Sequence, residues 1–239
     1  MKFDHVFSGK KPVIGMLHLL GDAKMSALER AKKEIEIYLA EGVDAFLVEN
    51  YFGSAYDCKT VLKWLYDNMP DALYGVNILG DTQTAFTLAA QYKAKFIQID
   101  SVCGHLRPKE DEAYAKALNT LRAQTDVCVL GGVRFKYQPV RSGRTLEEDL
   151  KLGMNRCDCV VVTGAGTGME TPEDKILSFR ETLPDFPIIT GAGVTRETVR
   201  RTMTISDGVI VGSYFKDGHR DFGELNPGFV RAFMKEASR

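Results

Sequence analysis

The chain has 239 residues, with 31 Lys and Arg against 32 Asp and Glu and a formal net charge of -1. This balance provides no basic field that would attract nucleic acid or an anionic membrane surface. No apolar run approaches the roughly 20 residues that a membrane-spanning helix needs, and the first residues have no apolar signal core. The five cysteines are an odd, scattered set, which is typical of reduced thiols. We therefore expect a cytoplasmic protein with no nucleic-acid partner and no membrane insertion.

Short apolar runs recur along the chain, and an amphipathic segment separates each from the next. The runs cover residues 13–17, 45–48, 73–76, 96–99, 127–130, 159–162, 188–190 and 208–211. Continuous apolar runs of this length are typical of parallel strands that are covered on both faces. Residues 27–40 illustrate the intervening helices, because apolar positions 28, 31, 35, 38 and 39 share one stripe. A further helix is predicted after Thr171, which would be its N-cap, with Pro172 as its first residue.

Successive strand starts lie 20 to 32 residues apart, so eight such units occupy nearly the whole chain. That total is close to the roughly 250 residues typical of a (β/α)8 barrel. An open doubly wound sheet is the alternative, but eight units without a long insertion favour closure. The sequence therefore predicts an α/β protein in which residues 1–239 form a single (β/α)8 TIM barrel domain. Its chemistry should lie at the carboxyl ends of the strands.

Glycine-rich loops follow the last two predicted strands. Gly191, Ala192 and Gly193 follow the seventh, and Gly212 and Ser213 follow the eighth. In many barrels these two loops bind phosphate through backbone N–H groups, and glycine permits close approach to an anion. Tight turns alone are the alternative explanation. The pattern favours a phosphate-binding role for all five residues.

A third glycine-rich segment, residues 163–168, follows the sixth strand. It lacks the G-x-G-x-x-G spacing and the position after the first strand that mark a dinucleotide site, so no such cofactor is predicted. We expect a mobile loop that closes over the barrel mouth, with Thr163 and Gly164 contacting substrate. A flexible connector is the alternative.

Two carboxylates follow predicted strands at the same end of the barrel. Glu49 follows the second strand and Asp100 the fourth. A carboxylate in a partly apolar mouth has a raised pKa and can serve as a general base, so the two residues are candidates for acid and base catalysis. Loop capping, or pairing with Arg134 or Lys136, is the alternative.

Arg134 and Lys136 flank Phe135 after the fifth strand. Alternate residues of an extended segment point the same way, so both basic groups are expected to reach one pocket. Arg134 would hold an anionic substrate, and Lys136 would do the same or act in catalysis as a proton carrier or Schiff-base amine. Ion pairing without chemistry is the alternative.

The remaining candidates for substrate binding are His18, Asn50 and Asn77, which also stand at predicted strand ends. A hydrogen-bonded strand-end histidine without chemistry is the alternative for His18. The pairs at positions 157 and 159 and at 103 and 105 each offer only two metal ligands, so no metal site is predicted.

Several blocks of sequence, in the same order along the chain, are similar to those of the BtpA/SgcQ family. They are residues 15–19 (GMLHL), 41–44 (EGVD), 48–50 (VEN), 75–79 (GVNIL), 162–164 (VTG), 167–168 (TG), 191–195 (GAGVT) and 207–218 (DGVIVGSYFKDG). The resemblance implies a (β/α)8 barrel. It also implies a connection with photosystem I biogenesis, the role for which the first member was named.

The chain also departs from that family pattern. Its first loop is short, Gly80 replaces an expected Asn, and Ala192 stands where a serine is usual. The segment after the fifth strand keeps Lys136 but lacks an expected Asp before it and His after it. These departures indicate a ligand different from that of the relatives.

The leading hypothesis is a lyase-like or isomerase-like barrel enzyme that acts on a small phosphorylated, sugar-like metabolite, without a cofactor. A homo-oligomer is compatible with this hypothesis. The alternative is a non-catalytic assembly or stability factor for a protein complex. A nucleoside triphosphate hydrolase is disfavoured because the chain has no P-loop.

Overall fold

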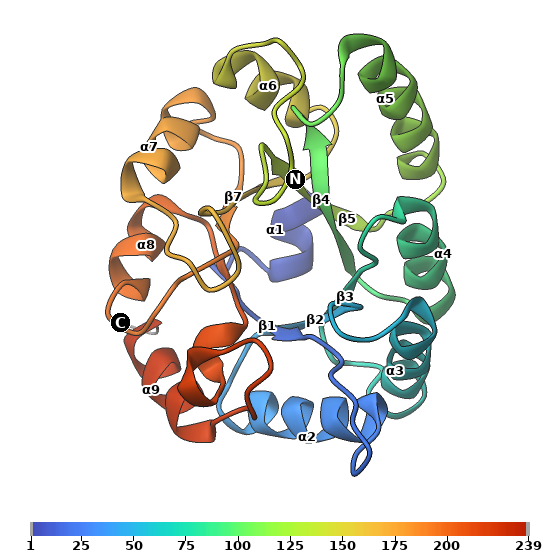
Figure 1. Cartoon of the computed structure of the whole chain (residues 1–239), viewed down its shortest axis with the longest axis vertical. Coiled ribbons are helices and arrows are strands. Elements are labelled where there is room, and N and C mark those ends of the chain that lie inside the picture. The colour runs from blue at the N-terminus through green and yellow to red at the C-terminus, as the bar shows by residue number, and fades with distance from the viewer. Residues whose placement is uncertain (1, 238–239) are drawn as a thin grey trace.

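A computed structural model describes residues 2–237 of the chain. Eight parallel strands form a closed barrel in the order β1-β2-β3-β4-β5-β6-β7-β8, which confirms the predicted (β/α)8 architecture (Figure 1). The strands are β1 (Val13–Leu17), β2 (Ala45–Glu49), β3 (Tyr74–Asn77), β4 (Phe96–Cys103), β5 (Cys128–Val133), β6 (Cys159–Val162), β7 (Ile188–Thr190) and β8 (Val209–Val211).

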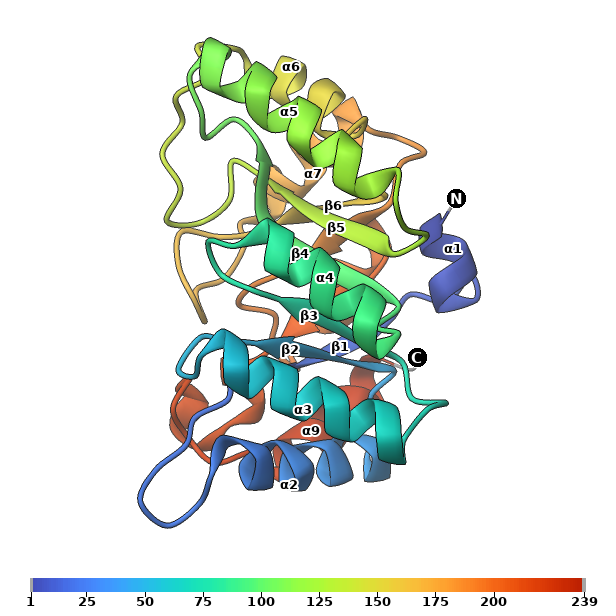
Figure 2. The same cartoon turned by 90° about the vertical axis from the view of Figure 1, so that its right-hand side faces the viewer.

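Helices surround the barrel, and Figure 2 shows three of them, α3, α4 and α5, covering one side of it. The helices are α1 (Lys2–Phe7), α2 (Ala27–Ala40), α3 (Ala55–Asn68), α4 (Thr82–Tyr92), α5 (Pro108–Arg122), α6 (Leu146–Gly153), α7 (Glu173–Thr182), α8 (Val199–Ile205) and α9 (Pro227–Ala237), with short 3-10 turns η1 (Ser213–Phe215) and η2 (Asp217–His219). None of the described helices is long and apolar enough to cross a bilayer.

Helix α2 occupies the predicted range, because the capping residues and the buried apolar face both specify a helix over these residues. Ser26 and Glu29 form a capping box at the N-terminus. Ile35 and Tyr38 are buried, and the Tyr38 hydroxyl donates to the Met16 carbonyl of β1 at 2.9 Å. Leu39, which the sequence placed on the same stripe, is exposed. The buried tyrosine thus fixes the helix against the first strand.

The start of α7 differs from the prediction. Pro172, not Thr171, is the N-cap, and it provides no side-chain hydrogen bond. The Thr171 hydroxyl instead donates to the Ala192 carbonyl at 2.9 Å. It therefore links the loop after β6 to the loop after β7. This tertiary hydrogen bond takes the place of the helix cap that the sequence predicted for Thr171.

Helix α1, which the periodicity did not predict, closes the end of the barrel where the strands begin. Its apolar residues Phe3 and Phe7 are buried, and the Phe7 ring lies 5.4 Å from that of Phe96 inside the barrel. Figure 2 shows α1 at the end opposite the loops that follow the strands. Apolar side chains fill the barrel above α1, so the open cavity is confined to the carboxyl end of the strands.

Candidate functional site

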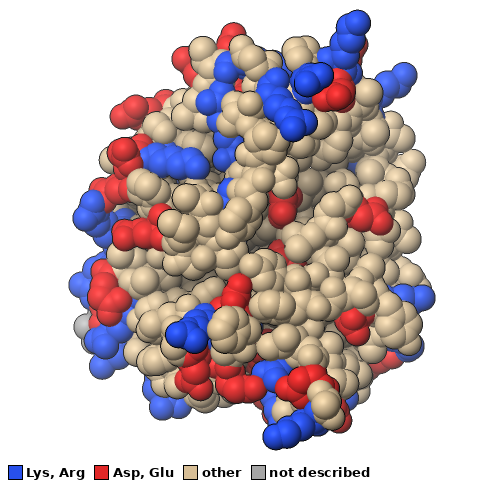
Figure 3. Space-filling model, viewed as in Figure 1, with Lys and Arg blue, Asp and Glu red and all other residues tan. Residues whose placement is uncertain are grey.

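A cavity of about 360 Å³ opens at the carboxyl ends of the strands. Met16, Phe135 and Ile210 line it and also belong to the apolar cluster that fills the barrel, so they form its floor. Figure 3 shows the face onto which the cavity opens. Lys and Arg lie mainly around the periphery of this face, and carboxylates are visible in the central hollow. The hollow is therefore acidic at its base.

Three neighbouring strands bring two carboxylates together at the base of the cavity. The register of β2 against β3 places Glu49 opposite Asn77. The Asn77 side-chain amide donates to Glu49 Oε2 at 2.7 Å and to Asp100 Oδ1 at 3.0 Å. Asp100 also accepts from the Gln98 amide at 3.3 Å. A single neutral amide thus bridges two acidic groups, which gives them hydrogen bonds but no counter-charge.

The secondary structure around Asp100 differs from the prediction. We predicted that the fourth strand ends at Ile99, but β4 continues to Cys103, with a register irregularity against β5 between these residues. Asp100 is therefore part of a strand, and its side chain lines the mouth on the same side as that of Gln98.

The environment of Glu49 raises its pKa to about 7. Burial is the largest cause, followed by the charge of Asp100, while Lys136 and the hydrogen bond from Asn77 oppose the increase. A carboxyl group with a pKa near 7 exists in both protonation states at neutral pH, as a group that both accepts and releases a proton must.

His18, at the end of β1, faces Glu49 across the cavity. Its Nε2 lies 4.0 Å from Glu49 Oε1. Burial, and next the charge of Lys216, lower the His18 pKa to about 3, so the imidazole is neutral.

Two groups contact Nδ1 of His18. Lys216 Nζ lies 3.4 Å from His18 Nδ1 and donates to the Asp221 carbonyl at 2.9 Å. An ammonium has only donors, which favours an accepting Nδ1 and a hydrogen on Nε2, whereas the Asp221 carbonyl, 3.5 Å from the same Nδ1, favours the opposite tautomer. With the hydrogen on Nε2, His18 presents an N–H to the cavity on the side of Glu49.

Among residues 2–237, Lys136 is the only Lys or Arg that lines the cavity. Its backbone N–H donates to the Thr163 hydroxyl at 2.9 Å, and its Nζ donates to the Thr167 hydroxyl at 3.2 Å. The Tyr137 hydroxyl accepts from the Thr167 N–H at 2.7 Å. The loop after β6 is therefore tied to the loop after β5, and Thr167 and Gly168 form part of the cavity wall.

The five predicted phosphate-binding residues, Gly191, Ala192, Gly193, Gly212 and Ser213, all line the cavity. Gly193 has a φ of +66°, and a Cβ there would lie 2.1 Å from the Met169 carbonyl oxygen. A Cβ on Gly212 would lie 3.0 Å from His18 Cε1. Glycine is thus required at both places, and in each case it lets the backbone approach a neighbouring wall of the site.

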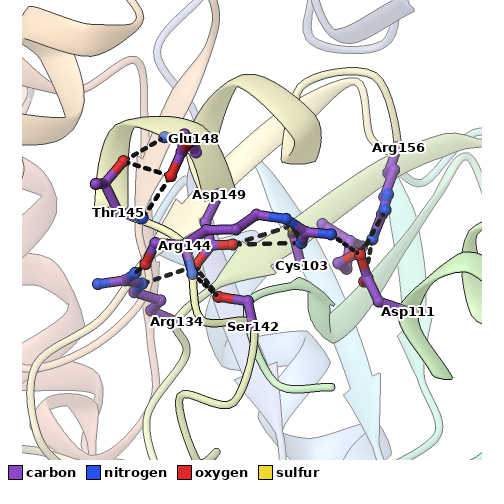
Figure 4. Close-up of polar contacts among 10 residues, drawn as sticks. Cys103, Asp111, Arg134, Ser142, Arg144, Thr145, Glu148, Asp149 and Arg156 are labelled. Atoms are coloured by element: carbon purple, nitrogen blue, oxygen red, sulfur yellow. Dashed lines mark hydrogen bonds and ion pairs between the residues drawn. The ribbon is translucent and has the colours of Figure 1, made fainter. Parts of the chain in front are cut away.

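Arg134 does not reach the cavity, so the expectation for its side chain was wrong. Strand β5 ends at Val133, and Arg134 has a φ of 48°, so the chain is not extended there and alternation fails. Its Nε donates to Asp149 Oδ2 at 2.9 Å, within a cluster of arginines and carboxylates between α5 and α6 (Figure 4). Ion pairing, the alternative for this residue, is what the structure shows.

Three other predicted substrate contacts lie beside the cavity and do not line it. The Asn50 side chain accepts from the Leu79 N–H at 2.8 Å, which ties the loop after β2 to the loop after β3. Thr163 is buried and holds the backbone of Lys136, and Gly164 packs under the carbonyl of Glu170. These residues support the loops. Asn77 likewise acts through the two carboxylates that it bridges.

Sequence reasoning missed several residues of the site. Gln98 and Tyr51 line the cavity, as do Thr167 and Tyr137. A signal existed for Gln98, because it is a polar residue two positions before Asp100 and thus on the same side of the strand. Lys216 is buried behind His18, 198 positions away in sequence, and nothing local indicated that contact. Within the described residues, no group of three or more His, Cys, Asp or Glu could hold a metal ion.

Comparison with known proteins identifies the family. Residues 9–239 match the BtpA family. The chain belongs to this family. It is 25% identical to the photosystem I biogenesis protein BtpA of Synechocystis, over 98% of this chain and 91% of the relative. It is 30% identical to an uncharacterized protein of Thermococcus kodakarensis, over 91% of each.

Solved structures similar to this BtpA-family chain are barrels of the same kind. A structure described as native KDPGal has a TM-score of 0.65 at 14% identity, covering 96% of this chain and 95% of its own. Phosphoribosyl anthranilate isomerase from Thermus thermophilus has a TM-score of 0.61 at 11% identity, covering 95% and 98%. Thiamine phosphate pyrophosphorylase from Pyrococcus furiosus has a TM-score of 0.61 at 16% identity, covering 98% of each chain. At sequence identities this low, the structural similarity shows a shared fold and nothing about activity.

Proposed function

We propose that this protein is an enzyme that transfers a proton on a small phosphorylated, sugar-like metabolite, in the manner of a lyase or an isomerase. One observation carries the proposal: Glu49, with a pKa of about 7, faces the neutral His18 at 4.0 Å across the cavity. The five cysteines of the chain are all unpaired, which favours a reducing compartment such as the cytoplasm as its location.

The two groups have complementary roles in proton transfer. The ionised Glu49 carboxylate takes a proton from a carbon next to a carbonyl group, and the Nε2 hydrogen of His18 donates a hydrogen bond to the carbonyl oxygen, on which the negative charge develops. Protonated Glu49 then returns the proton to a neighbouring carbon. The 4.0 Å between them leaves room for both to contact neighbouring atoms of one substrate. Asp100 keeps Glu49 basic through its charge, and Asn77 holds the pair in position.

The phosphate group would lie against the loops after β7 and β8, which adjoin His18 at the end of β1. Gly193 and Ser213 expose backbone there, and Thr167 and Gly168 bring Lys136 to the same side. The three carboxylates that line the cavity are Glu49, Asp100 and Glu197, so an anion is favoured only beside Lys136. The phosphates in the names of the isomerase and the pyrophosphorylase agree with this substrate class.

Ligand binding tests the anion site directly. We expect inorganic phosphate and sugar phosphates to raise the melting temperature, and the unphosphorylated sugars to raise it less. Lys136→Met should remove the difference, and Arg134→Met should retain it because that guanidinium is outside the cavity. Gly193→Asp is unsuitable, because its Cβ would collide with Met169. If no compound of a broad sugar-phosphate panel shifts the melting temperature, the proposal is wrong.

Proton transfer has its own test. A bound substrate should exchange a carbon-bound hydrogen for deuterium in D2O, and Glu49→Gln should slow the exchange at least about 100-fold, as loss of a general base does. Exchange at the wild-type rate in Glu49→Gln would exclude Glu49 as the base.

A second candidate function is a non-catalytic assembly factor. The name of the Synechocystis relative favours it, as do exposed apolar residues on loops near the mouth, including Phe52, Tyr137, Met169 and Phe222. The two functions differ in a cellular complementation assay. An assembly factor tolerates Glu49→Gln and Asp100→Asn, whereas the enzyme loses its role in both variants.

A further inference from the structure

A second cavity, of about 210 Å³, lies on the other side of Asp100 from the mouth. Strand β3 ends at Asn77 while β4 continues to Cys103, and their paired register stops at Ile97. Beyond that point the two strands separate, and the gap is lined by the loops that lead into α4 and α5. Gln98 and Asp100 line both cavities, so their side chains form a shared wall.

Two residues that line this second cavity have a buried polar atom without a partner. Among residues 2–237, only three buried side-chain N or O atoms make no hydrogen bond, and two of them, Ser101 Oγ and His105 Nδ1, belong to residues that line it. Ser101 is 6% exposed. A buried polar atom without a partner costs about 1–3 kcal/mol, so two in residues beside one cavity favour a ligand or solvent that a change of side-chain rotamer would bring into hydrogen-bond distance.

The size of the cavity distinguishes between a ligand and a single structural water. One water needs roughly 10–15 Å³ of such volume, whereas this cavity provides 210 Å³. Tyr114 holds the wall in place, since its hydroxyl donates to the Ser101 carbonyl at 2.9 Å and its ring lies edge-on to that of His105 at 5.3 Å. The space is therefore large enough for a group bigger than one water.

The lining determines the chemical class of that group. Within the described part of the chain, no Lys or Arg lines the cavity and Asp100 is its only carboxylate, so an anion is disfavoured. The other polar groups are hydroxyls, amides and an imidazole, from Thr82, Ser101, Gln138 and His105 among others. Burial lowers the pKa of His105, which favours the neutral ring that both donates and accepts. Such a set matches the alternating donors and acceptors of a sugar ring.

We propose that the cavity bounded by Asp100, Ser101 and His105 is a binding subsite for an uncharged polyhydroxyl group, such as a pentose ring. The binding itself stands on this cavity alone. The subsite is separate from the site of the proposed function, because the side chains of Gln98 and Asp100 stand between this cavity and the mouth. Asp100 would contact the polyhydroxyl group from the shared wall.

Two separate NMR titrations of the full chain test the subsite. D-ribose, up to about 100 mM because single sugar rings bind weakly, should shift the amide signals of residues 80–82 and 101–105. Ser101→Ala should weaken ribose binding about 3- to 10-fold, as loss of one hydrogen bond does. Ser178→Ala is the matched control, because that hydroxyl donates within its own helix, and it should leave binding unchanged.

Inorganic phosphate in the second titration should shift residues 191–193 and 212–213, with equal affinity in Ser101→Ala. Failure of phosphate alone would refute the anion site of the proposed function and leave the subsite standing. The subsite is refuted if ribose shifts none of its residues, if Ser101→Ala binds ribose as tightly as the wild type, or if the amine Tris shifts the same residues more strongly than ribose does.

Discussion

Two clusters of buried carboxylates occupy neighbouring parts of this barrel and differ in how their charge is balanced. In the cluster between α5 and α6, Asp111 accepts two hydrogen bonds from Arg156, at 2.6 and 3.0 Å, and one from Arg144 at 2.8 Å (Figure 4). At the mouth, Glu49 and Asp100 share only the neutral Asn77 amide.

The difference separates structural from chemical roles. Hydrogen bonds and charges from the arginines outweigh burial and lower the pKa of Asp111, so this carboxylate stays ionised and holds the helices together. Burial and Asp100 raise the pKa of Glu49 to about 7, so this group can exchange a proton near neutral pH. A buried carboxyl group is thus held ionised in one place and able to exchange a proton in the other.

The largest change in stability is expected in the cluster between α5 and α6, where arginines balance the charge of the carboxylates. Asp111→Ala leaves the buried Arg156 guanidinium without its partner, so we expect a loss of about 3–5 kcal/mol in the free energy of unfolding, measured with urea. Lys63→Ala, which breaks an exposed pair with Asp67, is the control and should cost less than about 0.5 kcal/mol. Equal losses in both variants would contradict the distinction.

At the mouth, where Glu49 and Asp100 have no arginine partner, removal of a carboxylate should increase the stability of the protein. The folded-state pKa of Glu49, about 7, lies above its ordinary 4.5, so the folded state favours the protonated form and loses stability as pH rises between these values. Glu49→Gln removes this loss. We expect the variant to gain about 1–3 kcal/mol relative to the wild type between pH 5 and pH 8, measured by urea unfolding at each pH. If the difference in the free energy of unfolding between the variant and the wild type does not change with pH, ionisation of Glu49 does not destabilise the folded state.

Asn77 tests whether one amide is enough to hold the pair. Asn77→Leu removes the hydrogen bond that favours ionised Glu49, so the pKa of Glu49 should rise further, by about one unit. The measurement is a carbon-13 NMR titration of the glutamate carboxyl groups, with Asn50→Leu as control because that amide accepts from a loop N–H instead. An unchanged pKa in Asn77→Leu would assign the shift to burial and Asp100 alone.

The smallest effect concerns His18. Lys216→Met removes the ammonium beside Nδ1, so the pKa of His18 should rise but stay below 6.5, because burial is the larger cause of its decrease. The freed Nδ1 can then donate to the Asp221 carbonyl, which lies 3.5 Å away. Nitrogen-15 NMR of the imidazole should show the hydrogen move from Nε2 to Nδ1. Retention of the Nε2 tautomer would show that Lys216 does not set it.

The sequence by itself determined the barrel. Apolar runs at regular intervals, with helical segments between them, can be buried on both faces only in a parallel sheet, and eight of them close. Because every parallel strand ends at the same rim, polar residues that follow the strands are gathered there whatever their separation along the chain. Glu49, Asp100, Lys136 and the two glycine loops could be placed at one mouth for this reason.

Only the tertiary structure decided which of these residues face the cavity and what their charge is. Arg134 follows a strand as Lys136 does, but a left-handed turn sends it to Asp149. Burial and next the charge of Lys216 lower the pKa of His18, and burial and next the charge of Asp100 raise the pKa of Glu49. Burial and distance between charges set these properties, and neither is a local property of sequence.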